Sequence, residues 1–376
     1  MLNARVPGAY GIAENAASGE PRCEGNDTMS KMMHAVAVTG EREAKLILME
    51  RPEPKPNEIQ IRIRACALCT WEQRVFIREK DTPLPLVGGH EIAGEISALG
   101  AGADENEYPL GARVTGRVQK ACQSCYYCRR GEPTQCVELN TFRLNGPEAY
   151  GMGGLAEYIC LDRSAVWRFE NELPFEQMAL SEPLACVLNS IHRAAPRMGD
   201  DAVVIGGGVM GQLHLMCLEK MGVRTILSEP DAARRDFAAS HGCRIALDPG
   251  REDAVDRVLQ LTGGRGAETV FNTTAISKVE EDAIRMTGKL GRCITYSSQH
   301  PDSPVSVSPN WLHNSEAVLT GAVNPSIVSF DQAVNLIGKG ILSLGDLVSA
   351  VYPKEQAAEA FEEALKPSTY RVVVRL

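Results

Sequence analysis

Apolar and polar residues alternate in short segments along the first half of the chain. Between about residues 34 and 186, glycine and proline turns separate segments such as EIQIRIRACAL, EIAGEISALG and ARVTGRVQ. A period of two residues is typical of strands with one buried face, and short strands between turns favour small twisted sheets or a barrel. This part of the chain is therefore predicted to be β-rich.

The pattern changes after Ser181. Five apolar strands then alternate with amphipathic helical segments, and these strands are AVVIGG, TILSE, RIALD, TVFNTT and CITYSS. Strands that alternate with helices predict a parallel, doubly wound sheet. Past Gly321 we expect a helix from Ser329, another in PKEQAAEAFEEALK and a final strand YRVVVRL. The predicted fold class is α/β with a β-rich partner domain.

These changes also predict the domain limits. Residues 1–32 show neither period, and we expect a disordered leader there. The β-rich domain covers 33–186 and the nucleotide-binding domain covers 187–325. Residues 326–376 are expected to return to the first domain.

Composition narrows the class of protein. The chain has 376 residues, 44% of them hydrophobic, and a formal charge of −9, which fits two domains and argues against nucleic acid as a partner. No apolar run is long enough to span a membrane and no signal peptide is visible, so the cytoplasm is the expected compartment. Twelve cysteines, four of them within fifteen positions, favour metal ligation and reduced thiols over disulfides.

A cysteine-rich loop is the strongest single motif. In ACQSCYYCRRGEPTQC, two residues separate each of the first three cysteines and seven separate the third from the fourth. This spacing lets one loop surround a tetrahedral ion with four thiolates and leaves no position for a substrate. We therefore predict a structural zinc site formed by Cys122, Cys125, Cys128 and Cys136.

A glycine motif predicts a Rossmann domain. Gly206, Gly208 and Gly211 have GxGxxG spacing between an apolar strand and a helix, so that backbone can approach a pyrophosphate at the helix N-terminus together with Val209 and Met210. Eighteen residues after Gly211, the next strand ends at Glu229, which can bind ribose hydroxyls and repel a 2′-phosphate. NAD is therefore favoured over NADP. Arg234 beside it can instead attract a phosphate, or form a rim over the adenine.

A second set of metal-competent residues lies outside the cysteine loop. Catalytic zinc takes about three mixed ligands and an exchangeable position, and the available side chains are Cys69, His90, Glu91 and Glu182. Taken singly, His90 could be a turn residue and Glu182 a carboxylate at a helix start. The sequence does not show that the four converge.

The order of these motifs resembles the zinc-dependent medium-chain dehydrogenase/reductase family, especially its sorbitol, polyol and threonine dehydrogenase-like branch, from about residue 33 to the end. The resemblance implies a GroES-like catalytic domain, a Rossmann domain and an active site in the cleft between them. It also implies a homodimer or homotetramer. Cys69 and His90 would ligate catalytic zinc, with Glu91 a ligand or a neighbouring carboxylate. Glu182 occupies the position of the polyol branch's glutamate, and Glu72 would steady the histidine.

The sequence departs from the family at the proton relay. A hydroxyl residue and a histidine are usual two and five positions after the ligand cysteine, where this chain has Trp71 and Arg74. Neither side chain accepts a proton at neutral pH. Thr70, a zinc-bound water, Glu91 or Glu182 can supply another route, and the favoured one is a zinc-bound water that passes its proton to Glu182. Trp71 and Arg74 are instead expected to line the substrate pocket, the alternative being a wall residue and a surface charge.

The function that these motifs favour is zinc-dependent oxidation of a secondary alcohol to the ketone by hydride transfer to NAD. The substrate class we expect is a polyol, a sugar or a sugar derivative, with an acidic substrate permitted by Arg74. Three alternatives stay open. They are reduction of an aldehyde or ketone, a non-redox reaction that uses transiently reduced bound NAD, and a noncatalytic cofactor-binding scaffold.

Overall fold

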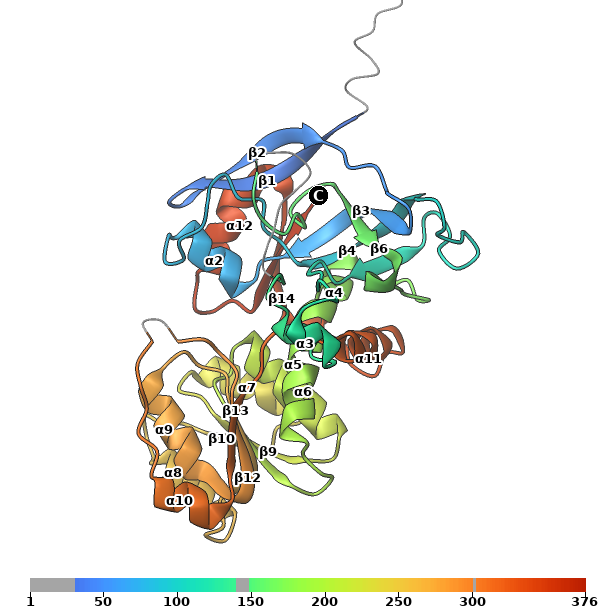
Figure 1. Cartoon of the computed structure of the whole chain (residues 1–376). Coiled ribbons are helices and arrows are strands. Elements are labelled where there is room, and N and C mark those ends of the chain that lie inside the picture. The colour runs from blue at the N-terminus through green and yellow to red at the C-terminus, as the bar shows by residue number, and fades with distance from the viewer. Residues whose placement is uncertain (1–30, 140–148, 300–301) are drawn as a thin grey trace, which may run out of the picture.

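The structure is a computed structural model that describes residues 31–139, 149–299 and 302–376. It consists of a β-rich part, drawn at the top of Figure 1 with the C-terminus, and a part with a parallel sheet below it. All but the last two residues of the expected leader lie outside the described ranges. No helix among the described residues is long and apolar enough to cross a membrane.

The β-rich part is built on a seven-stranded sheet in the order β14-β15-β3-β4-β5-β7, with β6 paired to β3. The alternation in β3 (Glu58–Ala67) buries Ile59, Ile61 and Ile63 completely and leaves Arg62 exposed, as a period of two requires. A separate antiparallel pair is formed by β1 (Met32–Gly40) and β2 (Glu43–Glu50). The remaining strands are β4 (Glu91–Leu99), β5 (Arg113–Gly116), β6 (Tyr158–Asp162), β7 (Val166–Arg168), β14 (Val348–Pro353) and β15 (Arg371–Arg375).

The lower part is a six-stranded parallel sheet in the order β10-β9-β8-β11-β12-β13. The prediction of a doubly wound parallel sheet is confirmed. Its strands are β8 (Asp201–Ile205), β9 (Arg224–Ser228), β10 (Ile245–Leu247), β11 (Ala267–Asn272), β12 (Thr287–Thr295) and β13 (Val318–Gly321). Its helices are α6 (Val209–Lys220), α7 (Ala232–Ser240), α8 (Ala254–Leu261), α9 (Ser277–Met286) and α10 (Pro309–Ser315).

The end of the chain runs back into the β-rich part. Strand β15 pairs antiparallel with β3 and parallel with β14, and α12 (Ala357–Ala364) packs against both β14 and β15. Helices α4 (Phe175–Ala179), α5 (Ser181–Ala194) and α11 (Ile327–Gly338) lie between the two parts (Figure 1). One hydrophobic cluster contains Ala65 of β3, Leu184 of α5 and Leu213 of α6. The two parts therefore share apolar core, and the domain boundary expected at 186/187 falls inside α5.

Candidate active site

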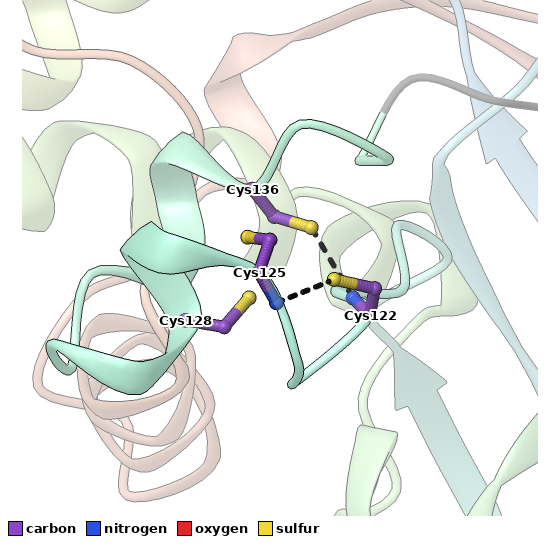
Figure 2. A group of neighbouring side chains, drawn as sticks. All are labelled: Cys122, Cys125, Cys128 and Cys136. Atoms are coloured by element: carbon purple, nitrogen blue, oxygen red, sulfur yellow. Dashed lines mark hydrogen bonds between the residues drawn. The ribbon is translucent and has the colours of Figure 1, made fainter.

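The four cysteines of the predicted zinc loop converge. Their sulfur atoms all lie within 4.8 Å of one another around α3 (Tyr126–Arg129) and the short 3-10 turn Pro133–Gln135 (Figure 2). Backbone amides already point at the sulfurs: Cys122 donates to Cys136 at 3.2 Å and Cys125 donates to Cys122 at 3.3 Å. The Ser124 hydroxyl and nearby amides lower the pKa of the Cys122 thiol to about 6. The donor set and its hydrogen bonds fit a tetrahedral tetrathiolate zinc site.

This loop contacts the segment through which the chain leaves the parallel sheet. Asn324 Nδ2 donates to the carbonyl of Thr134 in the loop at 3.1 Å, and the carbonyl of Asn324 accepts from Asn189 Nδ2 of α5 at 2.9 Å. Asn324 has φ +58°, a conformation that asparagine tolerates better than most residues. Because Val323 and Asn324 also line the large cleft, the loop supports one of its walls.

The second set of metal-competent residues also converges. Ligand atoms of His90, Glu91 and Glu182 lie within 4.8 Å of one another, and so do those of Cys69, Glu72 and His90. They come from three places, the end of β3 with the start of α2 (Thr70–Phe76), the start of β4, and the first turn of α5. Antiparallel pairing of β3 with β4 puts Ala67 opposite Glu91, which brings Cys69 and His90 together although 21 positions separate them. The sheet register therefore builds this cluster.

Glu72 fixes the histidine. Its Oε1 lies 3.0 Å from His90 Nδ1 and accepts the amide of Gly89 at the same distance. Burial opposes a charge on His90, but Glu72 and Glu182 raise its pKa well above the usual value. In the neutral ring, the contact with Glu72 keeps the hydrogen on Nδ1 and leaves Nε2 with its lone pair, which is the tautomer that ligates a metal ion.

The structure ties Glu91 to Arg371, a residue that sequence reasoning missed. Arg371 Nε and Nη2 donate to the two carboxylate oxygens of Glu91, and both side chains are buried. Both oxygens of Glu91 accept hydrogen bonds from Arg371. The side chains that keep an atom free to bind a metal ion are therefore those of Cys69, His90 and Glu182. Arg371 lies at the start of the final strand, YRVVVRL, and nothing in its sequence neighbours distinguishes it from a surface arginine.

Glu182 lies in the first turn of α5. Its Oε1 accepts the Cys186 thiol at 3.3 Å, one helical turn further on. Burial raises the pKa of Glu182 to about 7, although His90 lowers it. Cys186 is another residue that sequence reasoning did not select. The thiol orients the carboxylate and leaves its second oxygen for a metal ion or a proton.

One large cleft, of about 1410 Å³, contains the second cluster and the glycine turn together. Trp71 and Arg74 line this cleft, where they were predicted to form the substrate pocket, and exposed Thr70 lies beside them. Tyr296, at the end of β12, also lines the cleft and was not foreseen. Apart from His90, no histidine of the described residues lines it. The imidazole usual in a proton relay is thus missing from the described cleft wall.

The glycine turn has the geometry of a dinucleotide site. Gly206 has φ +96°, and a Cβ at Gly211 would overlap the carbonyl oxygen of Gly206, so the helix packs directly on the turn. A Cβ at Gly208 would meet only Arg234 Nη1 at 3.8 Å, which leaves open space above the first turn of α6. That space is where a pyrophosphate would face the helix N-terminus. Val209 and Met210 complete the turn and line the cleft.

Glu229 follows β9 at the edge of the same cleft. Its Oε2 accepts the amide of Gly207 at 2.5 Å and its Oε1 accepts the amide of Asp231 at 2.8 Å. Arg234 Nη1 lies 3.9 Å from Glu229 Oε2, and its Nη2 donates to the carbonyl of Pro367 at 2.5 Å. Gln212, which sequence reasoning did not select, ties the carbonyls of Gly207 and Arg234 together with its amide.

Comparison with known proteins agrees with this geometry. Residues 55–171 match the family model described as the alcohol dehydrogenase GroES-like domain, and residues 209–339 match the model of zinc-binding dehydrogenases. The chain is similar to D-arabinitol dehydrogenase 1 of Uromyces fabae, with 25% identity over 355 residues that cover 93% of this chain and 98% of the relative. It is also similar to L-threonine 3-dehydrogenase of Pyrococcus abyssi, with 27% identity over 342 residues, 89% of this chain and 95% of the relative.

Among solved structures, a zinc-binding dehydrogenase of Sinorhizobium meliloti 1021 bound to NADP superposes with a TM-score of 0.83 at 23% identity, over 92% of this chain and 99% of that chain. The chain belongs to the zinc-dependent medium-chain dehydrogenase/reductase family, in its polyol and threonine dehydrogenase-like branch. It is an alcohol or polyol dehydrogenase, and its fold is the predicted GroES-like domain with a Rossmann sheet. The scaffold alternative is thereby set aside.

Proposed function

We propose that this enzyme uses NAD to oxidise a secondary alcohol of a polyol, sugar or sugar derivative to the ketone, with catalytic zinc held by Cys69, His90 and Glu182. The observation that carries the proposal is that His90 and Glu182 line the same cleft as Gly208 and Met210. A metal ion bound by His90 and Glu182 and a nicotinamide dinucleotide bound at Gly208 and Met210 would therefore contact the same substrate.

The donor set fits catalytic zinc. A thiolate, an imidazole and a carboxylate are three mixed ligands, which leave a fourth position for the substrate. When bound, zinc polarises the alcohol oxygen and the nicotinamide accepts the hydride. The four-cysteine loop would hold a second zinc ion with a structural role, because four thiolates leave no open position.

The side chains around the cluster would orient the ligands and move the proton. Glu72 keeps the hydrogen of His90 on Nδ1, and Arg371 balances the buried charge of Glu91. The alcohol proton would reach Glu182 by way of a bound water, because Trp71 and Arg74 replace the usual relay groups and neither accepts a proton. The hypothesis fails if Glu182→Gln retains full activity, metal content and pH profile.

NAD is the proposed dinucleotide. Glu229 lines the cleft at the end of β9, and a carboxylate there repels the 2′-phosphate of NADP. Arg234 lies beside it and is the counter-argument, but its guanidinium already contacts Glu229 and Pro367. We expect the ratio of kcat/KM for NAD to that for NADP to exceed one, and expect Glu229→Ser to lower that ratio.

A homodimer or homotetramer is the proposed assembly. Strand β13 is an edge of the six-stranded sheet, and Val318 on it is 39% exposed. On the adjacent strand, Leu290 is 71% exposed. An edge strand with exposed apolar side chains can pair with a second copy. Light scattering tests the assembly, and a monomer at micromolar concentration would contradict it.

The compartment we propose is the cytoplasm. None of the eleven described cysteines forms a disulfide, which fits a reducing environment, and the zinc loop needs its thiols reduced.

Metal analysis and a substrate screen test the proposal. We expect about two zinc ions per chain, and formation of NADH when polyols, sugars and amino alcohols are supplied with NAD. One ion bound only by the cysteine loop would contradict the catalytic site. Activity with ketones alone would favour the reductase, and product formation without added NAD would favour the non-redox reaction.

A further inference from the structure

Beyond the metal cluster, α2 supplies a basic wall of the cleft. Trp71 and Arg74 lie on this helix, and Lys80 follows it; all three line the cleft. The Lys80 ammonium lies 5.7 Å from the centroid of the Trp71 ring. The aromatic face and the two cations therefore belong to one surface.

Arg74 has free hydrogen-bonding capacity at this wall. Its side chain is only 21% exposed, and its one ion pair joins Nε to Oε2 of Glu79 at 3.3 Å. Among the described residues, its two terminal nitrogens make no hydrogen bond. Glu79 is 57% exposed, so water competes for this pair. A mostly buried guanidinium that keeps two donors unused is suited to an anion from outside the protein.

Charge at the wall is not balanced. Lys80 has no carboxylate within 4 Å among the described residues, so of the two cations only Arg74 has a carboxylate partner, Glu79. The other acidic groups that line the cleft lie elsewhere: Glu91 and Glu182 lie in the metal cluster, Glu229 lies beside the glycine turn, and Asp282 pairs with Arg285. An anion bound here would replace Glu79 as the partner of Arg74.

The position of Arg74 sets the shape of such a ligand. Arg74 lies five positions after Cys69, which precedes α2, and at 1.5 Å per residue this is about 7.5 Å along the helix. A substrate that reaches both positions therefore carries its anionic end several carbons away from the oxidised carbinol. We propose, on the basis of the proposed function, that the substrate is a polyol derivative with a terminal carboxylate or phosphate, which Arg74 and Lys80 bind while the oxidised carbinol lies at Cys69, His90 and Glu182. Trp71 faces the intervening carbons.

The test compares three substrates with one carbon skeleton, a five-carbon polyol, its terminal phosphate and the corresponding aldonate. We expect the wild type to prefer one anionic form, and the two anionic arms separate phosphate from carboxylate. Arg74→Gln should lower kcat/KM for that form by about 10- to 100-fold, mainly through KM, because a hydrogen-bonded charge is lost. The loss of kcat/KM for the neutral polyol should be several-fold smaller. Lys80→Gln should likewise lower kcat/KM more for the anionic form than for the neutral polyol.

Arg78→Gln is the matched control. Arg78 is two residues beyond α2, pairs with Asp81 and donates to the carbonyl of Thr82, and it does not line the cleft. The Arg78→Gln variant should keep the wild-type preference for the anionic substrate over the neutral polyol. A wild type that prefers the neutral polyol, or an Arg74→Gln variant that loses equally on all three, overturns the proposal.

Calorimetric titration separates this proposal from the proposed function. If none of the three compounds is oxidised, the proposed function fails, but their binding to the NAD-loaded protein is still measured. Weaker binding of the anionic form to Arg74→Gln than to the wild type supports the anion site. Equal binding overturns it.

Discussion

Arg371 donates to Glu91 through Nε at 3.0 Å and through Nη2 at 2.7 Å, across 280 positions of sequence. Glu91 is fully buried and Arg371 is 2% exposed, so the pair is screened from water. Arg371 Nη2 also lies 3.8 Å from the sulfur of Met210, which is in helix α6. The last strand of the chain thus links the metal cluster to the dinucleotide turn.

Replacing Arg371 should be strongly destabilising. Arg371→Gln leaves the carboxylate of Glu91 buried and without its cation, which costs about 3 to 5 kcal/mol of unfolding free energy. Urea unfolding monitored by fluorescence measures the loss. Arg375→Gln on the same strand is the control, because Arg375 is 65% exposed and its pair with Glu176 is worth about 1 kcal/mol or less. Equal losses in the two variants would contradict the prediction.

Loss of the Glu72 carboxylate should weaken metal binding. Glu72→Gln can no longer hold a hydrogen on His90 Nδ1 as strongly, and changes of this kind cost about 10- to 100-fold in metal affinity. Competition with a chelator measures the affinity at the catalytic site. Glu95→Gln removes a half-exposed carboxylate that pairs with Arg64 on the same sheet, and it should have no effect. An unchanged zinc affinity in Glu72→Gln would show that the contact does not steady the ligand.

The zinc loop should depend on each of its cysteines. Cys128→Ser removes one thiolate of the four and should lower the zinc content by one ion per chain and make residues 122–136 sensitive to protease. Elemental analysis and limited proteolysis provide the readouts. Cys160→Ser changes a half-buried thiol outside the metal-competent clusters and should keep two ions. Full zinc content in Cys128→Ser would refute the four-thiolate site.

Stability should fall between about pH 6.5 and pH 4 because of His214. Burial lowers the pKa of this histidine from 6.5 to about 4, while its Nδ1 contacts the Met210 carbonyl and its Nε2 lies 3.0 Å from Ser190 Oγ. The unfolded chain binds the proton first as the pH drops, so this stability is complete above pH 6.5 and is lost as the pH falls towards 4. The full effect is about 3 kcal/mol.

His214→Gln isolates that contribution, because glutamine keeps a polar group and cannot be protonated. Urea unfolding of both proteins at pH 7 and pH 4.5 should show a smaller pH-dependent loss in the variant. His34→Gln, at a half-exposed histidine, serves as the control and should follow the wild type. Parallel pH curves for wild type and His214→Gln would contradict the assignment.

Much of the fold was predictable because it depends on local pattern. The period of β3 buries Ile59, Ile61 and Ile63, and the alternation of strands and helices after Ser181 gave the parallel sheet. Strand β13 and the antiparallel partner β2 were not foreseen. Their short, mixed segments carry little periodic signal, and pairing with neighbours decides that they are strands.

The sequence by itself determined the cysteine loop and the glycine turn, since all their essential atoms come from one short stretch whose spacing encodes the geometry. Only the tertiary structure decided which residues surround the second cluster. Register between β3 and β4 joined Cys69 to His90, helix α5 added Glu182 with Cys186, and β15 brought Arg371 to Glu91. Such contacts depend on strand pairing and helix packing across the whole chain. The residues next to these side chains in the sequence carry no pattern that predicts the contacts.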